Sequence, residues 1–269
     1  MPKRESILQK PIISKNAPTP APTAAYWRVN DFDQLISSQG YDALIDRAMR
    51  CPCCDKTTGQ ALSTCKNCLG RGWFFVDRRE TVVIAQHMDS KKRYQDWGEV
   101  NKGTASITTR GSDKLGFMDR IILTDLEEWF SEILRPIIFR DALVAYPVYE
   151  PLEVKSIYLF ISDDEPLYAI PENLYTVSGN KITFDKSLID KIIVPPMEKP
   201  IITVSIRYSH YPVYHVVDVN RELMKVRERN CSYSNERLTQ MPINIVARKA
   251  HYIFNAQNFD AEIFENSVK

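Results

Sequence analysis

Alternation of apolar and polar residues predicts β-strands through most of the second half of the chain. From 202 to 208 the even positions are Ile, Val, Ile and Tyr, whereas the odd positions are Thr, Ser and Arg. This period-two spacing places the apolar side chains on one face of a strand and the polar ones on the other. Other strands are predicted by short β-branched or aromatic runs, namely WFFV, TVVIA, GTASITTR, DRIILT, LYTVSG, KITF and YHVVDV. Gly179-Asn180, between LYTVSG and KITF, predicts a hairpin turn.

Helical spacing is found earlier in the chain. Apolar residues at i, i+3, i+4 and i+7 predict a short helix just before the cysteine-rich segment; they are Tyr41, Leu44, Ile45 and Ala48. A further short helical turn is indicated upstream by Phe32, Leu35 and Ile36.

Two other segments fit both kinds of element. Residues 126–134 have helical spacing and a possible Thr124–Glu127 capping box, but they also alternate weakly as a strand would. The segment INIVARKAHYIF near residue 250 fits either a last strand or a helix. Both interpretations stay open for each segment.

These patterns predict a mainly β protein with four parts. Residues 1–25 form an extended arm containing NAPTPAPTAA, and residues 26–76 form short helices and a zinc-binding module. Residues 77–145 form a small β-barrel, and residues 146–269 form a second β-rich region with a C-terminal segment. The arm is locally basic, with Lys3 and Arg4 near its start, and is either a disordered tail or an arm that contacts a neighbouring subunit or phosphate.

Charge and composition exclude several classes of protein. Lys and Arg number 35 against 34 Asp and Glu, giving a net charge of +1, whereas a protein that coats duplex DNA usually carries a basic excess. The sequence contains neither the glycine-rich motifs of nucleotide-binding enzymes nor the G-x-S-x-G motif that carries the nucleophile of serine hydrolases. No apolar run approaches the roughly 20 residues that span a bilayer, and the N-terminus lacks a secretory signal. We therefore expect a protein made in the cytoplasm, without a membrane partner.

The cysteines carry the strongest chemical signal. In CPCCDKTTGQALSTCKNCLGRGW, two C-x-x-C pairs stand ten residues apart, and they predict one structural zinc ion bound by Cys51, Cys54, Cys65 and Cys68. Paired knuckles of this kind supply four tetrahedral thiolates, and the glycines after the last cysteine allow a tight turn around the metal. Cys53 is either a buried thiol or a ligand in place of Cys54.

No group of residues predicts a catalytic site. His210 and His215 lie among tyrosines and are interpreted as sheet-packing or surface residues. Four thiolates would fill the coordination sphere of zinc and leave no position for an activated water. The basic clusters are interpreted as solvated faces, subunit contacts or phosphate contacts; they are Arg78 and Arg79, and Lys91, Lys92 and Arg93.

Several of these motifs together resemble the neck, or head-tail connector, proteins of tailed bacteriophages. The cysteine knuckle is followed by a valine-rich strand and then by Gly103–Thr109, similar to the "G-x-x-x-v-t" strand of that family. Gly116 with residues 119–122 (DRII) is similar to its "g-D-r-i" strand, and both belong there to a small β-barrel. YTVSGNKITF and ITVSIRYSHYPVYHVVDV resemble the hairpin and strand pair that follow in some members.

The resemblance implies a structural virion protein rather than an enzyme. Copies would form a homo-oligomeric ring in the phage neck, contact portal and tail proteins, and surround the channel through which packaged DNA passes. A near-neutral chain suits this role, since a strongly basic lumen would hold the phosphates tightly. The alternative is a zinc-ribbon regulatory protein that binds nucleic acid.

Overall fold

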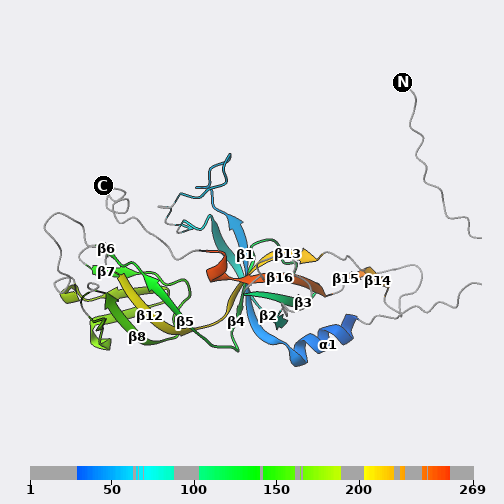
Figure 1. Ribbon diagram of the computed structural model, residues 1–269. Helices are drawn as coiled ribbons and strands as arrows, with labels where there is room; N and C mark the ends of the chain where they lie inside the picture. Colours follow the sequence, from blue (N-terminus) through cyan, green and yellow to red (C-terminus); the bar gives the residue numbers. More distant parts are fainter. Residues whose placement is uncertain are drawn as a thin grey trace, which may run out of the picture.

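The computed structural model describes residues 29–62, 65, 67–68, 70–87, 103–139, 142–160, 164, 166–188, 203–220, 225–227, 238–240 and 242–254. The predicted N-terminal arm, with Lys3 and Arg4, and the basic cluster at 91–93 lie outside the described residues. Within them the chain is mainly β, with a single short α-helix, as the sequence predicts (Figure 1). No helix in the described part is long and apolar enough to cross a membrane.

Six antiparallel strands close into a barrel at the centre of the molecule (Figure 1). In order around the barrel they are β1 (Tyr41–Arg50), β2 (Trp73–His87), β3 (Thr104–Thr109), β16 (Ile243–Lys249), β13 (Val213–Asn220) and β4 (Arg120–Leu123). Each strand contributes at least one buried apolar residue to a common core. Because every strand has a partner on both sides, the barrel has no free sheet edge.

Two further four-stranded sheets share a second apolar core. One has the order β10 (Tyr175–Ser178), β11 (Lys181–Phe184), β7 (Ala142–Ala145) and β6 (Ile137–Phe139). The other has the order β5 (Glu128–Leu134), β12 (Thr203–His210), β8 (Glu153–Phe160) and β9 (Tyr168–Ala169). In β12 Val204, Ile206 and Tyr208 are buried in this core, which confirms the predicted alternation.

Short elements complete the described chain. The helix α1 (Val29–Gln39) precedes the barrel, and single 3-10 turns are η2 (Glu172–Leu174), η3 (Lys186–Leu188) and η4 (Ala250–Tyr252). A separate ribbon pairs β14 (Lys225–Arg227) with β15 (Leu238–Gln240). The helical turn predicted around Phe32 and Ile36 is therefore confirmed, and Ile36 is its buried residue.

The predicted barrel boundaries, 77–145, are wrong. The barrel takes β1 from before the cysteine-rich segment and takes β13 and β16 from the predicted second region, whereas β5 to β7 belong to the other core. A closed barrel needs a partner for every strand edge, and β13 and β16, which close this one, begin 90 or more residues after the end of β4. Local patterning cannot reveal such distant pairing.

The helix predicted across Tyr41 to Ala48 is also wrong, because these residues form β1. Ala43 and Ile45 point into the barrel core with period-two spacing. The next residue, Asp46, lies at an irregularity in the β1–β2 register, where it is buried and forms ion pairs. Apolar residues on both sides of a bulged strand imitate the helical pattern.

The segments that the sequence left open are both strands. Residues 128–134 form β5, and INIVARK forms β16 before η4. The runs WFFV and TVVIA join into one strand, β2, which pairs with β1 from Trp73 to Val83 and with β3 from Ile84 to His87. The predicted hairpin is confirmed, since Ser178 pairs with Lys181 around Gly179, which has a φ of 56°.

Candidate metal centre

Residues 51–72 form an insertion between two strands that pair with each other. Arg50, the last residue of β1, lies opposite Trp73, the first residue of β2. One step further, the Cys51 N–H donates a hydrogen bond of 2.9 Å to the carbonyl oxygen of Gly72. The two ends of the insertion are thus fixed side by side by the barrel. We call this insertion the cysteine module.

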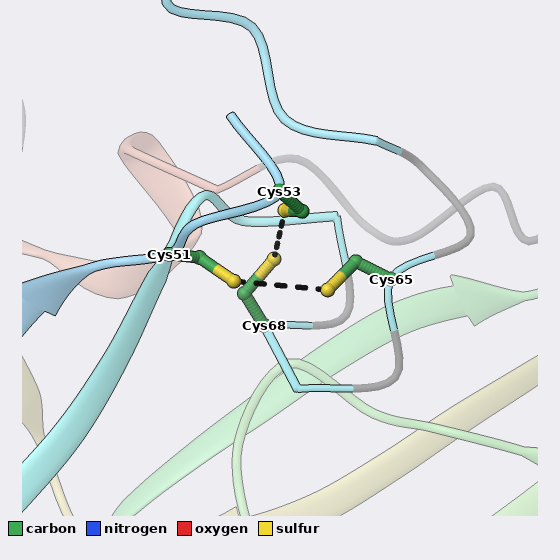
Figure 2. Close-up of side chains that lie close together, drawn as sticks. All are labelled: Cys51, Cys53, Cys65 and Cys68. Carbon is green, nitrogen blue, oxygen red and sulfur yellow. Dashed lines mark hydrogen bonds between the residues drawn. The ribbon is translucent and has the colours of Figure 1, made fainter. Parts of the chain in front are cut away.

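Four thiols of the cysteine module converge on one point (Figure 2). They belong to Cys51, Cys53, Cys65 and Cys68, and all four sulfurs lie within 4.8 Å of one another. The Sγ atoms of Cys51 and Cys65 are 3.7 Å apart, and those of Cys53 and Cys68 are 3.4 Å apart. Zinc–sulfur bonds of about 2.3 Å imply edges of about 3.8 Å in a tetrahedron of sulfurs. These cysteines are free thiols, and their spacing fits a tetrahedral metal ion.

One member of the cluster differs from the prediction, since Cys53 stands where Cys54 was expected. A turn closed by the Cys54 N–H and the Cys51 carbonyl oxygen, 3.1 Å apart, accompanies this arrangement. The Cys54 sulfur lies instead 3.5 Å from the carbonyl oxygen of Gly72. Spacing favoured C-x-x-C, but in CPCC the sequence alone does not decide which of two adjacent thiols faces the ion.

Backbone amides within the second knuckle prepare Cys65 to bind a cation. Hydrogen bonds from the backbone N–H groups of Cys68 and Asn67 lower the pKa of the Cys65 thiol to about 6. Burial acts oppositely on Cys68 and raises the pKa of its thiol to about 12. A metal ion that binds such a cluster displaces the thiol protons, and the backbone N–H groups then donate hydrogen bonds to the sulfur ligands.

The backbone around the cluster takes the tight turn that its glycines predict. Gly70 and Gly72 have φ angles of 74° and 75°, in the left-handed region that favours glycine. A Cβ atom on Gly72 would lie 3.3 Å from the sulfur of Cys54. The loop that follows Cys54 is held by the Asp55 carboxylate, which accepts hydrogen bonds from the backbone N–H groups of Thr57 and Thr58.

An ion-paired cluster lies at the end of the barrel beside the cysteine module. The buried Asp46 carboxylate accepts hydrogen bonds from Arg78 at 2.8 Å and from Arg120 at 2.8 Å. Burial alone would raise the pKa of Asp46, but these hydrogen bonds and the two positive charges bring that pKa below its usual value. The Arg120 guanidinium also lies over the ring of Phe75, 4.3 Å from its centroid. No local pattern in the sequence indicates this pairing, because Arg78 and Arg120 lie 32 and 74 residues after Asp46 along the chain.

The remaining candidate residues do not join the metal centre. Arg78 pairs with Asp46, and the neighbouring Arg79 is exposed on β2 opposite Ile45. His210 and His215 are both buried in the sheets, in agreement with their interpretation as packing residues. Burial lowers the pKa of His215 to about 4, so this imidazole is neutral near pH 7.

Comparison of the chain with protein-family models gives no match, and comparison with curated proteins gives no match either. The geometry of the cysteine module is therefore the main guide to function. Its four sulfurs can complete a tetrahedral coordination sphere without any further ligand.

Proposed function

We propose that the cysteine module binds one structural zinc ion through Cys51, Cys53, Cys65 and Cys68. The observation that carries this proposal is the convergence of four free sulfurs at separations close to the edge of a zinc–thiolate tetrahedron. Zinc prefers this geometry with thiolate ligands, whereas hard cations such as Ca²⁺ and Mg²⁺ prefer oxygen. A four-thiolate ion has no open position for water, so its role in this proposal is structural.

The cysteine module has reason to need a metal. Among its described residues only Cys51, Cys68 and Gly72 are buried, so it has almost no apolar core. Small modules without a core commonly depend on a metal or on disulfides for their fold. Zinc would fix the position of the insertion relative to β1 and β2 and give the barrel a rigid projection.

We further propose that the chain is a virion structural protein, a ring or adaptor subunit in the neck of a tailed bacteriophage. The support is the sequence resemblance together with the places where its motifs fall. The two barrel motifs fall on β3 and β4, which are both strands of the closed barrel. The hairpin motif falls on β10 and β11, and the last motif falls on β12 and β13.

In this role the chain would act through contacts rather than chemistry. A closed barrel with a second apolar core offers a rigid body for assembly. Its partners would be further copies of itself, the portal and the tail proteins, with DNA passing through the lumen. A net charge of +1 agrees with a channel that does not retain the DNA.

The metal is tested by elemental analysis of the full chain purified without added metal. About one zinc per chain is expected, whereas a folded chain that holds no metal and takes up none on addition would reject the metal centre. An exchangeable water on the bound ion would instead favour a catalytic site.

The assembly role is tested by measuring the mass of the purified chain, alone and with the portal protein from the same genome. Rings seen by electron microscopy, or a complex with portal, are expected. A chain that stays monomeric and ignores portal, but binds DNA with a steep salt dependence, would favour the nucleic-acid-binding alternative.

A further inference from the structure

The side chain of Arg71 lies beside the sulfur cluster without an ion-pair partner in the described part of the chain. Its backbone N–H donates a 2.9 Å hydrogen bond to the carbonyl oxygen of Cys68. Its Nε is buried and has no hydrogen-bond partner among the described residues. The guanidinium carbon lies 5.5 Å from the ring centroid of Phe254. A buried cation that lacks a carboxylate is costly unless another negative charge is present.

The nearby charges leave this end of the barrel with an excess of positive charge. Asp46 is the single carboxylate that pairs with Arg78 and Arg120 in the described structure. The charge of Arg120 repels that of Arg71, while Glu132 and the thiolate form of Cys68 attract it. Glu132 lies beyond ion-pair distance, and burial raises the pKa of its carboxyl. Among the residues that the structure describes, no carboxylate therefore forms an ion pair with Arg71.

Two cysteines of the cluster and two of the arginines line the same pocket, which has a volume of about 640 Å³. Cys51 and Cys68 form part of its wall, together with Arg71 and Arg120. The rest of the wall consists mainly of apolar and aromatic side chains: Pro52, Trp73, Phe74 and Phe75. Such surroundings have a lower dielectric constant than water, so charges across the pocket act strongly on one another.

We infer that Arg71 is the counter-charge of the metal-loaded cysteine cluster. The inference rests on the proposed metal centre. One divalent ion with four thiolates carries a net charge of −2, and this charge would arise beside a guanidinium that has no ion-pair partner among the described residues. Metal binding would thus replace an uncompensated cation by a compensated pair. Arg71 does not bind the ion itself but acts through the ligands, because its positive charge stabilises four ionised thiols around a divalent ion.

An external anion is the competing occupant for Arg71. A phosphate or carboxylate in the pocket would satisfy the guanidinium of the metal-free chain. In the metal-loaded chain, however, such an anion would lie next to the dianionic metal cluster and be repelled by it. The observations therefore favour the internal partner, and inorganic phosphate serves as the probe for the alternative.

The test compares the zinc affinity of full-length variants by competition with a chromophoric chelator. Arg71→Gln should weaken zinc binding by about 10- to 100-fold, the usual effect of losing a group that supports metal ligands. Arg71→Lys keeps the charge and should stay close to the wild type. Arg110→Gln is the matched control, because the Arg110 Nε is also buried without a partner but its guanidinium hydrogen-bonds Ser37, away from the cysteines. Arg71→Met replaces the glutamine variant if that one fails to fold.

Charge compensation also predicts opposite effects on the two forms of the chain. Arg71→Gln should leave the metal-free chain as resistant to urea as the wild type, or more resistant, while lowering the resistance of the loaded chain. Equal zinc affinity of Arg71→Gln and the wild type would overturn the inference, and so would an equal loss in Arg71→Lys, which would indicate packing rather than charge. Phosphate that binds the loaded wild type through Arg71 would overturn it as well. If the wild type itself binds no metal, the proposed metal centre fails instead.

Discussion

The sulfur of Cys53 lies 3.4 Å from that of Cys68. The adjacent thiol, that of Cys54, is directed to the carbonyl oxygen of Gly72 at 3.5 Å. Two neighbouring cysteines of one turn thus have different surroundings, although spacing alone would favour Cys54 as the ligand. The difference gives the metal centre a sharp test, because each residue is the control for the other.

Replacing Cys53 by Ala should remove one of four ligands, whereas replacing Cys54 by Ala should not. We expect Cys53→Ala to weaken zinc binding by more than about 100-fold, the upper end of what changes around the ligands cost. Cys54→Ala should keep about one zinc per chain. Cobalt substitution checks both variants, since four thiolates around Co²⁺ give strong charge-transfer absorption. The reverse ranking would restore Cys54 as the ligand.

Removing the metal should unfold the cysteine module and leave the barrel intact. The barrel core includes no cysteine. Of its eleven buried residues, all lie in the barrel strands except Leu115. The module, in contrast, has almost no buried residue besides its ligands. After treatment with a chelator, hydrogen exchange followed by mass spectrometry should accelerate across residues 51–72 and stay slow in β3 and β16. Fast exchange throughout the barrel would show that the metal supports the whole fold.

Asp46 should make stability fall in acid. Its folded-state pKa is lowered, so its contribution is present above the unfolded value near 3.9 and is lost as pH falls through the folded value. Asp46→Asn should reduce the free energy of unfolding by about 2 to 3 kcal/mol at pH 7, less than a fully buried pair because Arg78 is 56% exposed. The penalty should shrink toward pH 3. Urea unfolding at both pH values measures it, with the exposed Asp31→Asn as control.

Glu132 should act in the opposite direction. Its Oε1 accepts hydrogen bonds from the Tyr208 hydroxyl at 2.6 Å and the Val148 N–H at 2.9 Å, but Oε2 is buried without a partner. Burial raises the pKa of this carboxyl, so its folded form favours the proton and stability declines as pH rises from the unfolded to the folded value.

Glu132→Gln removes this titration and should flatten that decline. The variant should therefore compare more favourably with the wild type at pH 8 than at pH 4. The free energy of unfolding is measured at both values, and Glu127→Gln, at an exposed neighbouring position, serves as the control. A constant difference between Glu132→Gln and the wild type across this range would contradict the assignment.

What the sequence could reveal depended on how far apart the interacting residues lie. The Gly179 hairpin and the alternation in β12 follow from neighbouring residues, and both were predicted correctly. The cysteine cluster was predicted because its ligands lie within 18 residues, yet the choice between Cys53 and Cys54 required the turn geometry. Barrel closure by β13 and β16 and the pairing of Asp46 with Arg120 depend on contacts between distant segments, which local patterns do not contain.

Gly103, the first residue of a motif that carries the resemblance, should tolerate no side chain. It precedes β3, has a φ of 71°, and its backbone carbonyl accepts a 2.9 Å hydrogen bond from the Lys249 N–H. A Cβ atom there would overlap the ring of Tyr252. Gly103→Ala should therefore cost about 2 to 4 kcal/mol, from the left-handed backbone and the steric clash together.

The two causes can be separated with Tyr252→Ala, which removes the ring. In that background Gly103→Ala should cost only about 1 kcal/mol, the part due to backbone conformation. Urea unfolding of the four chains gives the coupling between the two positions, and a coupling of at least about 1 kcal/mol is expected for residues in contact. Additive effects would mean that Tyr252 does not lie against Gly103 in solution. In that case the glycine would be needed for its backbone angle alone, because no side chain would restrict the space beside it.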